Sequence, residues 1–141
     1  MASRHLSVRL SEDALEHLDA ESRRSGASRS ELAKTLIEEG LRMREHPGIV
    51  FRNGVVGRRP ALADGPQVWH VARVLRDVQV PPEKVIEETA ALTDLSVHQV
   101  QIVARYYAEC KDEIDDWIAR NDEEAERAHA AWLREQAVLN R

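Results

Sequence analysis

The 141-residue chain has a single cysteine, Cys110. One cysteine cannot form an internal disulfide, and it cannot supply a cysteine-rich zinc site. No base lies next to it in the sequence that could activate its thiol, so we expect a reduced thiol with a structural role.

Long hydrophobic runs are also missing. No segment approaches the roughly 18 consecutive apolar residues that are needed to cross a bilayer. The first residues, MASRHL, lack the apolar core of a secretory signal. The sequence therefore predicts a cytoplasmic protein without a membrane partner.

Patterns that build a catalytic or metal site are absent too. The six histidines have no metal-ligand spacing, and the chain has no glycine-rich phosphate loop. The acidic residues of the last third follow one another along one predicted helix, which favours a solvated face over a nuclease centre. We expect no enzyme, no catalytic residues, no bound metal and no cofactor.

Charge is distributed unevenly along the chain. The net charge is −5 overall, and it is −1 over residues 1–46, +3 over residues 47–80 and −7 over residues 81–141. The net charge argues against a protein that coats nucleic acid with a basic surface. An acidic segment in the last third is typical of a basic protein partner, although a solvated helix would look the same.

Apolar and polar side chains alternate over residues 5–10, which is the pattern of a half-buried strand. The apolar positions are Leu6, Val8 and Leu10, and the polar positions are His5, Ser7 and Arg9. A single strand leaves its edges unpaired, so this segment needs a second copy of itself.

Two amphipathic helices are predicted to follow the strand. Ser11 is placed to cap the first helix, and Gly26 to end it. Ser28 is placed to open the second helix with Glu31 in a capping box, and Pro47 stops it. The apolar stripe of the second helix consists of Leu32, Leu36, Ile37 and Leu41.

This strand-helix-helix segment resembles the ribbon-helix-helix family of bacterial repressors, the Arc/MetJ/CopG type. The resemblance is carried by HLSVRL, by SED at the first helix and by GASRSELAKTLIEEGL across the second. It implies a homodimer, or a higher even oligomer, whose two strands pair and enter the major groove of operator DNA. The expected dimer core is Leu6, Val8, Leu10, Leu32, Leu36 and Leu41. The expected base contacts are His5, Ser7 and Arg9, and the expected phosphate contacts are Ser28, Arg29 and Ser30.

The middle of the chain predicts a hairpin followed by short helices. Asn53-Gly54 lies between two β-rich runs and indicates a tight turn. Helical spacing begins at Val68, Pro82 can open another helix, and Ser96 can cap a further one. A helix-turn-helix follows as an interpretation, with Ser96, His98, Gln99 and Arg105 as a possible second DNA or partner surface.

GRRPALADGPQV, at residues 57–68, is similar to the hairpin motif of a small bacterial family known as domain of unknown function 433. The glycine, arginine and proline positions fit that motif, whereas Pro66-Gln67 depart from it. The resemblance implies an antitoxin of the VapB type, whose partner is a toxin related to the PIN-fold ribonucleases.

Residues 111–141 predict one long polar helix with apolar patches near its two ends. The expected toxin contacts are Trp117, Trp132 and Leu133, because tryptophan is enriched at interface hot spots. For Trp117, a place in the core of the preceding domain is an equally good interpretation. Trp132 has little around it to bury it, so a partner or a second subunit is favoured there.

The predicted fold class is mainly α. It combines a ribbon-helix-helix domain (1–46), a β-hairpin and helix-turn-helix-like domain (47–118) and an acidic helical arm (119–141). The predicted function is a DNA-binding antitoxin that represses its own operon and neutralises its toxin. The alternatives are a transcriptional repressor without a toxin, and a protein-binding scaffold whose DNA-binding head has lost its function.

Overall fold

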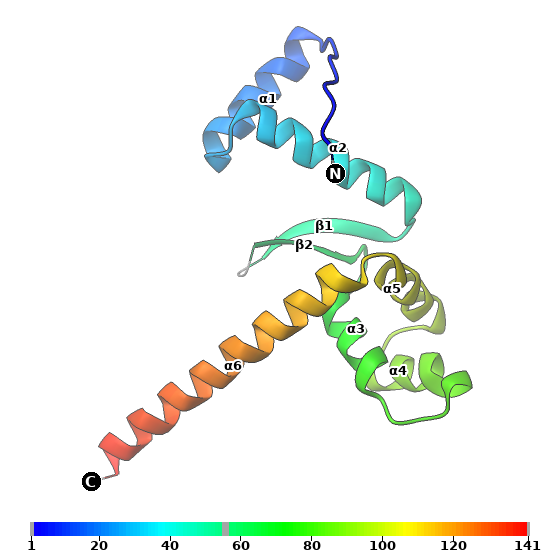
Figure 1. Ribbon diagram of the computed structural model, residues 1–141, viewed down its shortest axis with the longest axis vertical. Coiled ribbons are helices and arrows are strands. Elements are labelled where there is room, and N and C mark those ends of the chain that lie inside the picture. The colour runs from blue at the N-terminus through cyan, green and yellow to red at the C-terminus, as the bar shows by residue number, and fades with distance from the viewer. Residues whose placement is uncertain (1, 55–56, 141) are drawn as a thin grey trace. The chain divides into compact units, whose positions relative to one another are not determined.

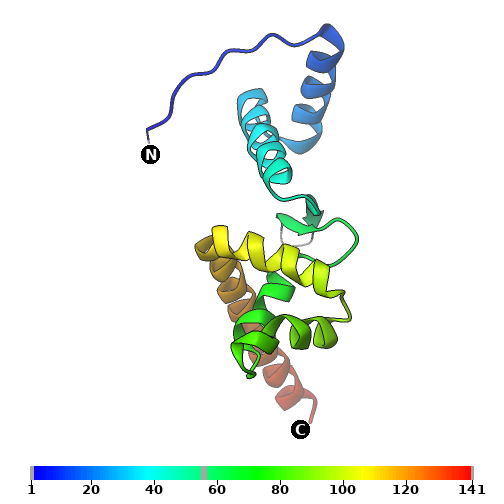
Figure 2. The same ribbon diagram turned by 90° about the vertical axis from the view of Figure 1, so that its right-hand side faces the viewer.

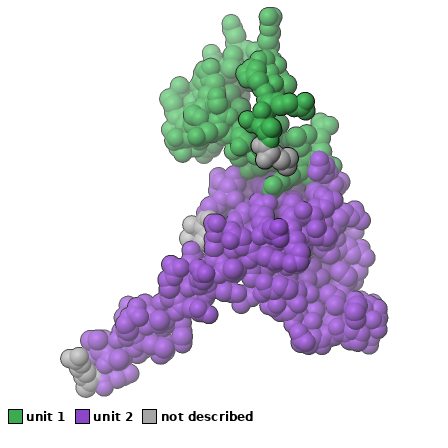
Figure 3. Space-filling view, viewed as in Figure 1, with its two compact units in different colours: residues 1–44 green, residues 45–141 purple. Residues whose placement is uncertain are grey.

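The computed structural model describes residues 2–54 and 57–140. The chain is mainly helical with one small antiparallel sheet of two strands. It divides into two compact units, residues 1–44 and residues 45–141, which are coloured separately in Figure 3. Each unit is described by itself below.

Unit 1 consists of two helices, α1 (Glu12–Ser25) and α2 (Arg29–Glu45), the second of which continues to the first residue of unit 2. The Ser11 side chain caps α1 by accepting a hydrogen bond from the Ala14 N–H at 3.2 Å. Gly26 ends α1 in the left-handed conformation, with φ of 77°, which costs glycine little because it has no Cβ. Both ends of α1 therefore lie where the sequence predicts them.

Unit 2 begins with a β-hairpin, β1 (Ile49–Gly54) paired with β2 (Gly57–Leu62). The register sets Ile49 opposite Leu62 and Gly54 opposite Gly57. The predicted turn at Asn53-Gly54 is therefore wrong, because both residues lie within β1. The connection is made by residues 55 and 56, which lie outside the described residues.

Four helical segments follow this hairpin: α3 (Val68–Asp77), the short 3₁₀ helix η1 (Pro82–Lys84), α4 (Val85–Thr93) and α5 (Val97–Glu109) (Figures 1 and 2). Pro82 opens η1, where its missing N–H has no cost. Ser96 caps α5 in a complete capping box with Gln99. These starts follow the sequence prediction.

The hydrophobic core lies within unit 2, where the hairpin meets α3, α5 and the start of α6 (Lys111–Leu139). Val68 and Val71 of α3 and Val100 and Tyr106 of α5 are fully buried in it. The buried apolar residues are Ile49, Leu62, Val68, Trp69, Val71, Ala72, Ala90, Val100, Val103, Tyr106, Ile114 and Ile118.

Helix α6 is continuous from Lys111 to Leu139, so the predicted arm from residue 119 is the outer part of one helix. Ile114 and Ile118 anchor its first turns in the core. Arg73 of α3 pairs with Asp122 at 2.9 Å. The remainder of α6 extends away from the other helices of unit 2 (Figure 1, orange to red). No helix among the described residues is both long enough and apolar enough to cross a membrane.

Candidate nucleic-acid interface

The predicted ribbon precedes α1 and has no regular secondary structure in the single chain. A lone strand has no partner for its backbone groups, so this segment can become a strand only when another strand pairs with it. Nε2 of His5 lies 2.9 Å from Oγ of Ser7. Two residues that are two positions apart therefore share one side of the chain, as the alternation predicts.

The large apolar residues of unit 1 are at most partly covered. No hydrophobic residue among residues 2–44 is buried, and α1 contains no buried residue of any kind. Leu6 is 70% exposed, Leu36 49% and Leu41 55%. The other exposed large apolar residues of this unit are Val8, Leu10, Ile37 and Met43.

The start of α2 is the predicted phosphate site, and part of it is occupied by contacts within the chain. The Ser28 side chain accepts a hydrogen bond from the Glu31 N–H at 3.2 Å. The Arg29 guanidinium donates two hydrogen bonds to the carboxylate of Asp19, both at 2.8 Å. Ser30 is exposed. The N–H groups of Arg29 and Ser30 have no acceptor within the helix, so they can receive an oxyanion.

Part of the second predicted surface, on α5, is engaged in contacts within unit 2. Ser96 and Gln99 form the capping box, and the Gln99 side-chain amide also donates to Asp64 at 3.1 Å. These two side chains are therefore engaged in contacts within unit 2, and the second surface on α5 stays a prediction. His98 and Arg105 remain exposed on α5.

The predicted partner residues on α6 fall into two groups. Trp117 is half-buried and packs against the core, with the guanidinium carbon of Arg59 5.1 Å from the centre of its ring. Trp132 is 52% exposed and Leu133 50% exposed, on the part of α6 that extends from the unit. Among the described residues, the ring that stacks with Trp132 is that of His129 on the same helix, at 6.0 Å between ring centres.

Two features of unit 2 were missed by the sequence patterns. Burial lowers the pKa of Arg59, and its Nη1 atom is buried without a hydrogen bond among the described residues. An apolar groove of about 530 Å³ is lined by Leu75, Arg76, Pro82, Val85, Ile86, Ala104, Tyr107, Ala108 and Lys111. Its lining comes from separate elements, so no local motif could have revealed it.

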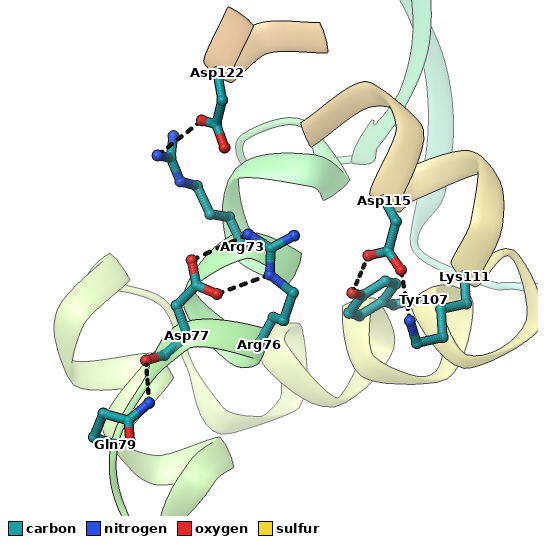
Figure 4. A network of polar contacts seen from close by, with 8 residues as sticks. All are labelled: Arg73, Arg76, Asp77, Gln79, Tyr107, Lys111, Asp115 and Asp122. Atoms are coloured by element: carbon teal, nitrogen blue, oxygen red, sulfur yellow. Dashed lines mark hydrogen bonds and ion pairs between the residues drawn. The ribbon is translucent and has the colours of Figure 1, made fainter. Parts of the chain in front are cut away.

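A polar network joins α5 to α6 at the edge of this groove (Figure 4). The Tyr107 hydroxyl donates to the carboxylate of Asp115, and Lys111 Nζ lies 2.5 Å from the same carboxylate. Burial and the bond to Asp115 raise the pKa of Tyr107 to about 12. The hydrogen bonds from Lys111 and Tyr107 lower the pKa of Asp115. The network fixes the first turns of α6 against α5.

Comparisons of this chain with protein-family models, with curated proteins and with solved structures give no match.

Proposed function

We propose that the chain is a homodimeric ribbon-helix-helix DNA-binding protein that acts as the antitoxin of a toxin-antitoxin module. It represses its own operon through unit 1 and neutralises a ribonuclease-type toxin through α6. The observation that carries the proposal is the uncovered apolar surface of unit 1, in which residues 2–44 bury no hydrophobic side chain.

A second copy supplies the missing cover. Burying a large aliphatic side chain stabilises a protein by about 1.5–3 kcal/mol, and the apolar residues of unit 1 are roughly half exposed. Pairing of two ribbons places Leu6, Val8 and Leu10 of both copies over the helices. The same pairing turns His5, Ser7 and Arg9 outward.

The outward side chains suit base edges in a major groove. Arg9 can donate two hydrogen bonds to O6 and N7 of guanine, whereas serine and histidine can form hydrogen bonds with several different bases and so discriminate less between them. The start of α2 would hold a backbone phosphate, with Arg29 exchanging its bonds to Asp19 for the phosphate oxygens. Phosphate contacts position the protein, and Arg9 specifies the sequence.

The toxin is assigned to the outer part of α6. Trp132 and Leu133 are large, exposed and without a core to enter. Acidic residues lie on the same helix, most of them nearer its start, and complement a basic, RNA-binding nuclease surface. These acids include Asp122, Glu123, Glu124, Glu126 and Glu135.

A repressor without a toxin is the second candidate. His98 and Arg105 stay exposed on α5 and are able to contact DNA from unit 2. In that case Trp132 and Leu133 would serve contacts between subunits.

Arg9→Ala tests the DNA half of the proposal. The full chain is titrated onto the duplex from directly upstream of its gene in a gel-shift assay at fixed salt. Loss of one bidentate contact per copy should weaken binding by roughly tenfold or more, since each contact discriminates by about 1–3 kcal/mol. Arg134→Ala, which removes an exposed arginine from α6, is the matched control and should bind as the unchanged chain does. Equal binding by Arg9→Ala would show that the ribbon is not the reader.

The double variant Trp132→Ala, Leu133→Ala tests the toxin half. The chain is co-expressed with the product of its neighbouring gene, and growth and co-purification are measured. We expect that the double variant no longer rescues growth and no longer co-purifies with the neighbouring product, while it still binds DNA. Leu92→Ala, at an exposed leucine on α4, is the control. If the double variant also lost DNA binding, or kept both activities, the assignment of DNA binding to unit 1 and toxin binding to α6 would be contradicted. If the product of the neighbouring gene were not toxic, the repressor without a toxin would be favoured.

A further inference from the structure

Three metal-ligating side chains that the proposed function does not use meet at the start of unit 2. They are Glu45, His46 and Glu109, and one donor atom from each lies within 4.8 Å of the others. Nε2 of His46 and Oε2 of Glu109 are 2.8 Å apart. The histidine and its partner are separated by 63 positions in the sequence, so sequence spacing gives no sign of this cluster.

The imidazole is held in place by its surroundings. The His46 side chain is only 3% exposed. Its ring meets that of Tyr106 edge to face, with 4.9 Å between the ring centres and 74° between the planes. The His46 carbonyl accepts a hydrogen bond from the Ile49 N–H at 3.0 Å, which anchors the backbone. A ligand that is already oriented loses little freedom when it binds an ion.

The electrostatic setting of the cluster favours a cation. Glu45 is the last residue of α2 and Glu109 the last of α5, where the helix dipole is negative. The last turn of α5 contains no basic residue, whereas the last turn of α2 contains Arg42 and Arg44. Within the described chain, the carboxylate of Glu45 has no hydrogen-bond or ion-pair partner, and the nearby Lys111 is paired with Asp115.

We propose that Glu45, His46 and Glu109 bind a divalent transition-metal ion of the zinc type, through Nε2 and one oxygen of each carboxylate. One nitrogen and two oxygen donors suit such an ion, whereas calcium and magnesium prefer ligand sets made of oxygen alone. The site ties residues 45 and 46, where the chain enters unit 2, to the end of α5.

The geometry needs only a small adjustment. Zinc bonds of about 2.0–2.2 Å set tetrahedral donors about 3.3–3.6 Å apart. Nε2 of His46 and Oε2 of Glu109, which are 2.8 Å apart, must therefore separate slightly. The Glu45 carboxylate must therefore approach by up to about 1.5 Å, which its exposed side chain can do by rotation. Water completes the coordination. The ion would take the place of the hydrogen bond between Nε2 of His46 and the Glu109 carboxylate.

Calorimetric titration of Zn²⁺ into the full chain, stripped of metal with a chelator, tests the site. We expect one ion per chain. Glu45→Gln and Glu109→Gln should each weaken binding at least about tenfold, since even the loss of an outer-shell partner has that effect. Both positions are exposed, so these variants should keep the far-ultraviolet circular dichroism of the unchanged chain. Glu83→Gln and His129→Gln, which remove an exposed carboxylate and an exposed imidazole elsewhere, should bind Zn²⁺ normally.

Histidine ring resonances of the unchanged chain give a second readout that requires no variant. The His46 ring signals should change first as Zn²⁺ is added, and excess Mg²⁺ should not reverse the change. The proposal is overturned if no saturable binding occurs, if the double Glu→Gln variant binds as tightly as the unchanged chain, or if other histidines take the ion while His46 does not. None of these results depends on DNA or toxin binding.

Discussion

Leu36→Ala should weaken dimerisation of the chain without disturbing its helices. Leu36 lies on α2 and is 49% exposed in the single chain. It belongs to the stripe that the second copy is proposed to cover. Alanine is the best helix former, so the substitution leaves the helix itself intact.

The size of the effect follows from the exposed half of the side chain. Complete burial of a leucine contributes about 2–3 kcal/mol, so covering the remaining half contributes about 1–1.5 kcal/mol per copy. Both copies lose this term, which gives about 2–3 kcal/mol per dimer. The dimer dissociation constant should therefore rise roughly 30- to 150-fold, at about 1.4 kcal/mol per factor of ten.

Sedimentation equilibrium over a range of protein concentrations measures this constant directly. Leu92→Ala, at a leucine that is 62% exposed on α4 of unit 2, is the matched control and should dimerise as the unchanged chain does. A chain that is monomeric at micromolar concentration, or one whose association responds equally to both substitutions, would refute the assignment of the dimer contact to unit 1.

Two further outcomes concern unit 2. Gly48→Ala should destabilise the chain by about 1–3 kcal/mol in urea unfolding, because Gly48 has φ of 97° and an added Cβ would lie 2.8 Å from Cδ1 of Ile102; unchanged stability would rule out that close approach. Tyr107→Phe should lose less folding stability than the unchanged chain as the pH rises above 10, which thermal melts at a series of pH values measure. Because the folded pKa of Tyr107 is raised to about 12, its contribution is complete below pH 10 and is lost as the pH rises towards 12. An identical pH profile for the phenylalanine variant would count against the bond to Asp115.

Helix ends were predictable because the signals that set them are local. Ser11, Ser28 and Ser96 each accept a hydrogen bond from an N–H three residues ahead, and this geometry needs no information from the rest of the fold. Gly26 likewise ends α1 by its own conformational freedom.

In the hairpin, packing of the core overrides a local turn signal. A two-residue turn at Asn53-Gly54 would set Ile49 opposite Arg58. The observed register instead sets Ile49 opposite Leu62, and both side chains are buried in the core. Pairing Ile49 with Leu62 brings two apolar side chains together in the core, and their burial outweighs the turn preference of an asparagine-glycine pair.

Long-range pairs could not be predicted at all. The contact between His46 and Glu109 and the capping role of Gln99 beside Asp64 both depend on the tertiary fold. For the same reason, periodicity could not choose between the core and a partner for Trp117, whose packing against Arg59 involves a strand far away in the sequence.

Fluorescence anisotropy of the duplex from directly upstream of the gene tests the central claim, that paired ribbons read operator DNA. The full chain is titrated at fixed salt against this duplex and against an unrelated duplex of equal length. The account predicts an even number of chains per operator and binding at least about a thousandfold tighter than to the unrelated duplex. Equal affinity for the two duplexes, or saturation by one chain, would contradict it.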